Sequence, residues 1–580
     1  MITRAHKGGL YINNYAELIT SHFGKILHPI FCEESNYLLY EYSIFKENIS
    51  LRIEVPESFP RKLPQVYVAG YEDSKDFYSH VESNGKICYL PTENILYDTG
   101  KPDQLFVECI QKALKVIDTW ETGIMKKDFR KEFLSYWAMT CKKKFAKLKS
   151  YSEAGDSFEE WEVILSSKQD MVFRKNDNNK DKILTNLLGE NYVKDNLKSY
   201  DALYLPLRLS DDLVPPNPKH EFNIQSIKRL IDGNLRSSVK KQFKVWLKKP
   251  RKSFWIILGI PISKGNTVLV GAFVKNYGKN NPLKKNEHKN TLTPLLIERN
   301  DKVYQINRTS QNYSLSNMSV AIIGVGSVGA IVANNLSKMG VSSLTLIDDD
   351  TLELENISRH LLGFNNLNKD NSLKVDALQE YLELQNPHIS INIESLSFQN
   401  LVKKAPTFFD EIDIIVSCTG DTITNFDITN FFKDTNKKIL FGWLDPYGIG
   451  SHCLVVDNQN IGCYKCLNYG PDGLTTNRAS FAREGQYFEK NLASCVSSFV
   501  PYNYLSSNSA ASLICDGLLR LIEGDIAQKN ILLSSLGRTK QFLNEGFQLS
   551  NRYEQCVKAN KYLETENFHS TYCPICGKAE

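Results

Sequence analysis

The sequence predicts an α/β protein of several domains. Its 580 residues can bury several hydrophobic cores, which predicts about two to four domains. Residues 319–350 (SVAIIGVGSVGAIVANNLSKMGVSSLTLIDDD) read as a strand, a glycine turn, a helix and a second strand ending in acids, half of a dinucleotide-type fold. Near the N-terminus, strand-like segments (36–45 and 49–56) precede a helical pattern over 103–120. We therefore expect an N-terminal α+β domain (1–147), a middle linker domain (148–305) and a C-terminal dinucleotide-type domain (306–580).

Composition excludes several classes of protein. The formal net charge of +4 does not favour a chain that coats nucleic acid. The basic run over 240–252 fits a solvated helix face better than a nucleic-acid surface. The longest apolar run (254–262) is too short to span a bilayer, and the N-terminus lacks an apolar signal core. We expect a cytoplasmic protein without a membrane partner.

The middle region carries no motif that indicates chemistry. Residues 174–182 are polar and read as a loop or linker. Two apolar strand patterns flank Ser263–Asn266 and predict a hairpin. Thirteen cysteines are scattered along the chain, so in a reducing compartment they are core residues, metal ligands or nucleophiles.

A glycine pattern marks the candidate nucleotide site. Gly324, Gly326 and Gly329 form G-x-G-x-x-G directly after the strand SVAII. The first two let the backbone turn and approach a phosphate, and the third lets helix and strand pack closely. The following helix start offers free N–H groups to an anion. Asp348 and Asp350 end the next strand, where a carboxylate can bind ribose hydroxyls.

Two cations distinguish this site from a hydride-transfer site. Arg359 and Lys374 follow the acids. Each alone could be a surface charge, but an enzyme that cleaves a triphosphate needs cations where charge builds up on oxygen. With these residues, 306–580 resemble the ThiF-type activating enzymes, which include the MoeB and ThiF proteins and the ubiquitin-activating enzymes. The resemblance implies a Rossmann-like adenylation domain that uses ATP and Mg²⁺ and forms a homodimer.

The same resemblance implies roles for individual residues. Asp350 would hold the ribose, and the phosphates would be held by Asn356, Arg359 and Lys374. Asp421 would bind Mg²⁺, although Gly420 is inserted before it relative to the family pattern. For the arginine that a partner subunit supplies in this family, Arg299 and Arg308 are candidates.

Two C-x-x-C pairs indicate a metal site. Each pair can place two thiolates on one metal, and together they complete a tetrahedral Cys₄ site for Zn²⁺. Four unrelated cysteines are the alternative. The resembled family carries zinc at these positions, and a site with no open coordination position would be structural. The four candidate ligands are Cys463, Cys466, Cys573 and Cys576.

Cys495 lies between these pairs. In the resembled family, a cysteine here in the crossover loop takes the activated acyl group or carries sulfur. Cys515 lies on an apolar helical pattern and is expected in the core.

A second thiol follows a turn in the N-terminal region. The stretch SNGKICYL (83–90) places Cys88 directly after the Asn84-Gly85 turn, which keeps a thiol near the surface. With the Pro56, Phe59, Pro60 and Pro64 pattern, this region resembles the ubiquitin-conjugating fold, whose acceptor cysteine occupies this position. Where that family has an oxyanion-stabilising Asn, this chain has His80, which could donate a hydrogen bond or be structural.

An activating and a conjugating region on one chain predict an acyl relay. ATP and a protein's C-terminal carboxylate would give an acyl-adenylate, then a thioester on Cys495, then one on Cys88, and finally an amide on an amine such as lysine. The order of regions resembles fusion proteins of anti-phage CBASS operons, which implies a cGAS/DncV-like nucleotidyltransferase as the activated partner. The alternatives are a sulfur-carrier adenylyltransferase of MoeB/ThiF type, a different bacterial ubiquitin-like conjugation system and an inactive scaffold.

Overall fold

A computed structural model describes most of the chain as two compact units. One unit comprises Met1–Asp177 and Asn191–Asp301, and the other Asn178–Glu190 and Lys302–Glu580. None of the helices in the described ranges combines the length and the apolar character that crossing a bilayer requires. The described residues are 4–23, 28–31, 36–44, 47–90, 96–121, 124–141, 147–189, 197–284, 290–309, 313–367, 373–491, 498–526 and 529–577.

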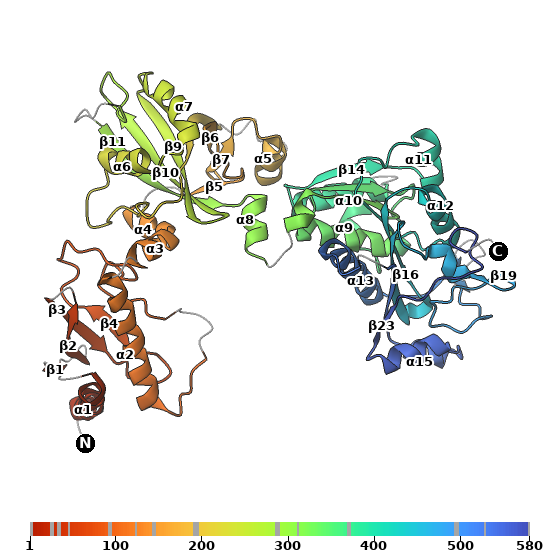
Figure 1. The fold of residues 1–580 in the computed structure, drawn as a ribbon, viewed down its shortest axis with the longest axis horizontal. Coiled ribbons are helices and arrows are strands. Elements are labelled where there is room, and N and C mark those ends of the chain that lie inside the picture. The colour runs from red at the N-terminus through yellow and green to blue at the C-terminus, as the bar shows by residue number, and fades with distance from the viewer. Residues whose placement is uncertain are drawn as a thin grey trace. The chain divides into compact units, whose positions relative to one another are not determined.

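The first unit begins with a helix, an antiparallel four-stranded sheet in the order β1-β2-β3-β4, and three further helices (Figure 1). The helix predicted over 103–120 is confirmed as α2, whose buried Phe106, Ile110, Ala113 and Ile117 recur at helical spacing. They share one core with the sheet. The elements are α1 (Arg4–Phe23), β1 (His28–Phe31), β2 (Asn36–Ile44), β3 (Glu47–Glu54), β4 (Gln65–Val68), α2 (Pro102–Asp118), α3 (Ile124–Lys131) and α4 (Phe133–Thr140).

The rest of the first unit contains a closed barrel, with strands in the order β10-β11-β5-β7-β6-β8-β9, and the helices α6 and α7. The predicted hairpin is confirmed, because β9 and β10 pair antiparallel on either side of the turn. Trp161 stacks on Tyr204 with ring centroids 4.5 Å apart, and both side chains are buried. The elements are β5 (Leu148–Ser150), β6 (Glu159–Leu165), β7 (Met171–Arg174), β8 (Lys198–Pro206), α6 (Ile224–Asn234), α7 (Ser237–Leu247), β9 (Ser253–Ser263), β10 (Asn266–Asn276) and β11 (Asn290–Arg299).

The second unit contains an eight-stranded sheet in the order β14-β13-β12-β15-β16-β17-β22-β23. The strands β14, β13, β12, β15 and β16 are parallel to one another. Strands β17, β22 and β23 continue the sheet with antiparallel pairing. Its elements are α8 (Lys302–Asn307), β12 (Ser319–Ile323), α9 (Ser327–Met339), β13 (Ser343–Ile347), α10 (Lys374–Gln385), β14 (Ser390–Glu394), α11 (Phe398–Lys404), β15 (Ile414–Ser417), α12 (Thr422–Phe432), β16 (Lys438–Leu444), β17 (Gly450–Asp457), β18 (Tyr469–Gly470), β19 (Gly473–Leu474), β20 (Lys490–Asn491), β21 (Ser498–Phe499), α13 (Tyr504–Glu523), β22 (Ile531–Leu536), α14 (Lys540–Asn544), α15 (Asn551–Lys558) and β23 (Tyr562–Thr565).

One further helix of the second unit departs from the sequence prediction. Residues 174–182 read as a loop, but α5 (Lys180–Leu188) begins within them. Its Lys182 Nζ lies 2.8 Å from Glu383 Oε1 and donates to the carbonyl of Ile389. These polar contacts stabilise a helix whose sequence alone gives a weak helical signal.

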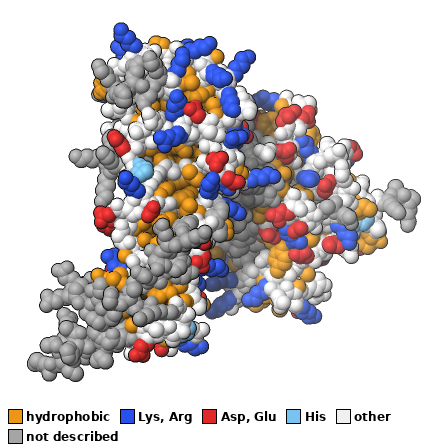
Figure 2. All heavy atoms as spheres, turned by 60° about the vertical axis from the view of Figure 1, so that its left-hand side comes forward, with side chains coloured by type: hydrophobic (Ala, Val, Ile, Leu, Met, Phe, Trp, Pro, Cys, Tyr) orange, Lys and Arg blue, Asp and Glu red, His pale blue; other side chains and the backbone are white. Residues whose placement is uncertain are grey.

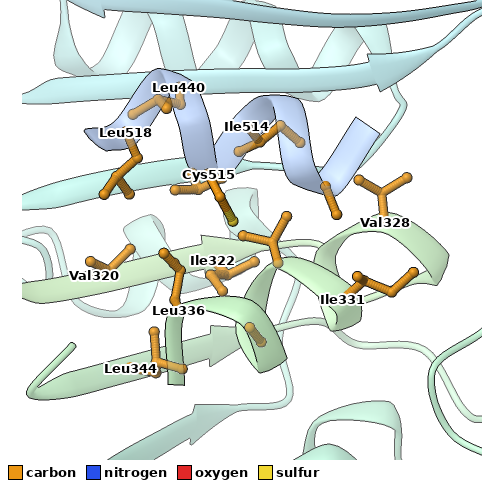
Figure 3. Close-up of a cluster of buried hydrophobic side chains, with 14 of the residues drawn as sticks. Val320, Ile322, Val328, Ile331, Leu336, Leu344, Leu440, Ile514, Cys515 and Leu518 are labelled. Atoms are coloured by element: carbon orange, nitrogen blue, oxygen red, sulfur yellow. The ribbon is translucent and has the colours of Figure 1, made fainter. Parts of the chain in front are cut away.

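Helix α13 packs against α9 and the sheet (Figure 3). Ile514, Cys515 and Leu518 of α13 lie in the same buried cluster as Ile322 of β12 and Leu336 of α9. The expectation that Cys515 is a core residue is therefore confirmed.

The surface is mixed in charge. On the face drawn in Figure 2, basic and acidic side chains both occur across the molecule. This agrees with the small formal net charge of +4.

Candidate functional site

The glycine loop joins β12 to α9 and is held by close backbone contacts. Gly324 has φ of +84°, a conformation that favours glycine, and its N–H donates to the carbonyl of Ile347 at 2.8 Å. A Cβ on Gly329 would lie 1.9 Å from the carbonyl oxygen of Gly324, so this position requires glycine. A Cβ on Gly326 would meet no atom within 4 Å, which leaves open space beside the start of α9.

The acids after β13 have two different environments. The carboxylate of Asp348 accepts the Val325 N–H at 2.7 Å and the Asp350 N–H at 2.9 Å, which fixes it to the glycine loop. Burial raises the pKa of Asp348 above its ordinary value. The side chain of Asp350 is 70% exposed and lies 2.7 Å from Lys374 Nζ, whose side chain is 10% exposed. Asp348 thus supports the loop, and the exposed Asp350 forms an ion pair with the buried Lys374.

A cavity of about 270 Å³ lies beside this loop. It brings together five residues singled out from the sequence: Gly324, Gly326, Asp348, Asp350 and Lys374. Its other walls were not singled out: Ile323, Ile347, Asp349, Leu396, Ser397, Phe398, Gln399, Cys418, Thr419 and Thr424. Most of these wall residues follow the carboxyl ends of parallel strands, where ligands bind in open α/β sheets, and that rule was the available signal.

Gln399 in this wall is held by its amide. Its Nε2 donates to Thr424 Oγ1 at 3.1 Å and to Asp427 Oδ2 at 2.9 Å. The Gln399 side chain is thus fixed as one polar part of the cavity wall.

Four predicted site residues do not line this cavity: Gly329, which packs against the backbone of the loop, and Asn356, Arg359 and Asp421. Asn356 accepts the Glu353 N–H at 3.1 Å within a short turn. The Arg359 guanidinium lies 5.1 Å from the centre of the Tyr502 ring. Asp421 caps α12 by accepting the Thr424 N–H at 2.7 Å. Burial opposes ionisation of Asp421, but its hydrogen bonds with Thr424 and Ile423 outweigh burial and lower its pKa.

The two candidates for an arginine supplied to the partner subunit's site lie in different environments. Arg299 does not fit the role, because its side chain is 7% exposed and pairs with the fully buried Asp301 at 2.6 Å. Arg308 lies 5.9 Å from the Tyr304 ring and is exposed.

The four predicted metal ligands lie together. The sulfurs of Cys463, Cys466, Cys573 and Cys576 all lie within 4.8 Å of one another. Cys463 and Cys573, 110 residues apart, have sulfurs 3.6 Å apart. A tetrahedral site with Zn–S bonds of about 2.3 Å needs sulfurs roughly 3.8 Å apart, so the four thiols fit zinc. Arg478 holds the surroundings by donating to the carbonyls of Cys466 and Phe568.

Cys495 falls in residues 492–497, outside the described residues. The segments on either side pair with each other: Lys490 with Phe499 and Asn491 with Ser498.

The SNGKICYL turn exposes its thiol. Gly85 has φ of +85°, and the Asn84 side chain accepts the Lys86 N–H at 3.0 Å. Ile87 is buried and donates its N–H to the carbonyl of Val66, so the next side chain, Cys88, points outward and is exposed. The turn chemistry therefore places this thiol at the surface.

One carboxylate contacts the Cys88 thiol. Its Sγ lies 3.6 Å from Glu82 Oε1. Cys88 is exposed at the surface, but its sulfur is partly enclosed by neighbouring atoms, and this partial burial, followed by the negative charges of Glu82 and Glu132, raises the pKa of Cys88 to about 11. The thiol is thus largely protonated near neutral pH, and the thiolate forms only transiently.

His80 is held by acids. Its Nδ1 lies 3.0 Å from Glu132 Oε1 and its Nε2 3.5 Å from Asp128 Oδ2. Its backbone has φ of +60°; the carbonyl accepts the Cys88 N–H at 2.7 Å, and the N–H donates to Tyr136 Oη at 2.6 Å. Both ring nitrogens therefore face carboxylates, which favours a structural role over hydrogen bonding to an oxyanion.

The two regions match two protein families. Residues 298–555 match the ThiF family, and residues 33–146 match the prokaryotic E2 family B. The chain is therefore a fusion of a ubiquitin-conjugating-like domain with a ThiF-type activating-like domain, the arrangement found in CBASS anti-phage operons.

Two relatives are similar to this chain over most of their own length, and a third over a shorter part. An ATP-dependent ubiquitin transferase-like protein Cap2 of Escherichia coli is 22% identical over 93% of this chain and 95% of its own length. The Cap2 of Pseudomonas aeruginosa is 21% identical over 81% of this chain and 82% of its own. Ubiquitin-like modifier-activating enzyme 5 of Caenorhabditis elegans is 24% identical over 26% of this chain and 37% of its own.

Among solved structures, E. coli MccB with MccA-N7isoASN matches 48% of this chain and 70% of its own, at 17% identity and a TM-score of 0.33. The family matches and the Cap2 relatives support an ATP-dependent activating enzyme of the ubiquitin-transferase-like class.

Proposed function

We propose that this protein activates the C-terminal carboxylate of a partner protein with ATP and conjugates it to an amine. The observation that carries the proposal is the exposed thiol of Cys88 on a chain that also contains the glycine loop and the Asp350–Lys374 pair. A scaffold that only binds would need neither feature, and a sulfur-carrier activator would not use the Cys88 domain.

The first step is adenylation. A carboxylate oxygen attacks the α-phosphorus of ATP, the bond to the β-phosphate oxygen breaks, and pyrophosphate leaves. Asp350 would hold the ribose, and Lys374, Asn356 and Arg359 the phosphates. Mg²⁺, when bound, neutralises the charge of the phosphates, and Asp421 would be its protein ligand.

Acyl transfer follows. The Cys495 thiol gives its proton to solvent, its sulfur attacks the acyl carbon, and AMP leaves. The Cys88 thiol then gives its proton to solvent, its sulfur attacks the thioester carbon, the bond from that carbon to the Cys495 sulfur breaks, and the Cys495 thiol reforms by taking up a proton. Finally an amine attacks the acyl group on Cys88; an amide forms, the amine loses a proton, and the Cys88 thiol is restored.

The arrangement of domains supports one partner over others. Because this fusion occurs in CBASS operons, we propose a cGAS/DncV-like nucleotidyltransferase as the carboxylate donor and lysine as the acceptor amine. We also propose that the ThiF-type domain forms a homodimer and that the Cys₄ site binds structural Zn²⁺.

The order in which Cys495 and Cys88 receive the acyl group tests this proposal. With purified partner and ATP, Cys88→Ala should accumulate a thioester on Cys495, which an added thiol cleaves, and should form no amide. Cys495→Ala should still exchange pyrophosphate into ATP but load neither thiol. Cys141→Ala, which changes a thiol outside the proposed relay, is the matched control and should form the amide. A Cys88 adduct in the Cys495→Ala protein would contradict the relay.

Pyrophosphate exchange tests the nucleotide assignment separately. Asp350→Ala and Lys374→Ala should each abolish exchange while the far-UV circular dichroism spectrum stays unchanged. Wild-type exchange in either variant would contradict the assignment.

A further inference from the structure

Tyr502 touches two parts of the nucleotide region. Its hydroxyl lies 2.8 Å from Ser327 Oγ, on the first residue of α9 after the glycine loop. Its ring lies 5.1 Å from the guanidinium carbon of Arg359. The Tyr502 side chain therefore contacts both the start of α9 and the guanidinium of Arg359.

The backbone around Tyr502 is fixed on both sides. The carbonyl of the preceding residue, Pro501, accepts the Tyr447 N–H at 2.6 Å. The following residue, Asn503, caps α13 by accepting the Ser506 N–H at 3.0 Å. Helix α13 is in turn packed against α9 through the buried cluster drawn in Figure 3. The backbone on either side of the Tyr502 ring is thus anchored, on one side to Tyr447 and on the other to the start of α13.

The contact leaves Arg359 able to bind an anion. A guanidinium that lies over an aromatic ring uses its face, so its N–H groups at the edge stay free for phosphate oxygens. Across the described part of the chain, no carboxylate forms an ion pair with Arg359. The ring therefore restricts the long Arg359 side chain without neutralising its charge. Because the side chain is already restricted, it loses less conformational entropy when phosphate binds.

We propose that Tyr502 is a positioning residue for the phosphate end of the nucleotide site. Its ring supports the Arg359 guanidinium, and its hydroxyl fixes that support to the start of α9 through Ser327. This inference rests on the proposed binding of ATP. A purely structural tyrosine would instead affect nucleotide and nucleoside alike.

The experiment measures the dissociation constants of Mg²⁺–ATP and of adenosine, by calorimetry and by competition. Tyr502→Leu should raise the constant for ATP about 5- to 20-fold, the range expected for a cation–π contact, and leave that for adenosine within about twofold. Tyr502→Phe keeps the ring and loses the hydroxyl, so it should give a smaller rise for ATP, matched by that of Ser327→Ala.

A double-mutant cycle separates support of Arg359 from general destabilisation. In an Arg359→Ala background, Tyr502→Leu should raise the constant for ATP by less than about twofold, because the supported cation is already gone. Full additivity, an equal rise for adenosine, or an unchanged constant for ATP in Tyr502→Leu would each overturn the proposal. If Tyr502→Leu does not fold, Tyr502→Phe and Ser327→Ala are compared, and an unchanged constant for ATP in both would overturn the role of the Tyr502–Ser327 contact.

Failure of the inference can be told from failure of the proposed function. Wild-type protein that does not bind ATP would refute both. Wild-type protein that binds ATP, with weaker binding in Arg359→Ala and unchanged binding in Tyr502→Leu, would refute the role of Tyr502 alone.

Discussion

The sulfur of Cys88 lies 3.6 Å from a carboxylate oxygen of Glu82. A carboxylate at this position disfavours a thiolate and favours a cation. The site therefore keeps the free thiol protonated and would suit an ammonium group approaching a thioester.

Glu82→Gln should increase the reactivity of Cys88. Burial and then the charge of Glu82 raise the pKa of the thiol to about 11, so in the wild type the rate of alkylation should rise about tenfold per pH unit up to about pH 10. Removing the charge lowers the pKa, and the rate at pH 8 should increase several-fold. Iodoacetamide labelling, followed by peptide mapping, measures this rate. Glu72→Gln, at an exposed acid, is the control; equal rates in all three proteins would contradict the assignment.

The ion pairs of His80 predict a stability that depends on pH. The hydrogen bond with Glu132, opposed by burial, raises the pKa of His80 above its ordinary value. A raised histidine pKa stabilises the fold below the unfolded pKa of about 6.5, and the stabilisation is lost as pH rises through the folded pKa. Glu132→Gln should therefore lower the melting temperature most near pH 6 and least near pH 9.

The expected loss near pH 6 is at most about 1 kcal/mol, because the pair is partly exposed. His22→Gln, at an exposed histidine on α1, should show no such dependence. A Glu132→Gln deficit that grew toward pH 9 would show that Glu132 acts through something other than the charge of His80.

Two glycines of the same loop should respond differently to alanine. A Cβ at Gly329 would lie 1.9 Å from the Gly324 carbonyl oxygen, so Gly329→Ala should destabilise the protein by about 1–3 kcal/mol in urea unfolding. A Cβ at Gly326 meets no protein atom within 4 Å, so Gly326→Ala should fold normally. It should nevertheless weaken ATP binding, because the new methyl group would occupy space left for a phosphate. Unchanged ATP affinity in Gly326→Ala would place the phosphates elsewhere.

The Cys₄ cluster should contain one zinc per chain. Elemental analysis of purified protein measures the content, and Cys573→Ser should lose the metal and several degrees of melting temperature. Cys556→Ala, at a buried cysteine outside the cluster, should keep the metal. Full stability in a strong chelator would contradict a structural metal.

Local signals were the predictable part of the fold. The helix α2, the β9–β10 hairpin and the glycine loop each depend on residues close together in sequence, whose periodicity or turn chemistry is readable directly. The Cys₄ cluster spans a long separation, but each half has a distinctive two-residue spacing.

The surroundings of the candidate sites were not predictable in this way. The acids Asp128 and Glu132 that hold His80 come from a distant part of the sequence and have no motif. The Leu396–Gln399 wall of the nucleotide cavity is likewise ordinary in sequence and becomes a wall only because β14 lies beside β13. Such contacts are set by tertiary packing, which single-sequence patterns do not encode.

The Cys463–Cys573 contact joins positions 110 residues apart and encloses the elements from β18 to β23 in one large ring of chain. With metal bound, this ring behaves as a cross-link, and closing so long a ring removes much conformational freedom from the unfolded chain. A protease cut between Asn491 and Ser498 would open the ring without separating its two fragments, since the thiolates and the paired strands hold them. The nicked protein should therefore run as one species on a sizing column, and as two bands only after denaturation.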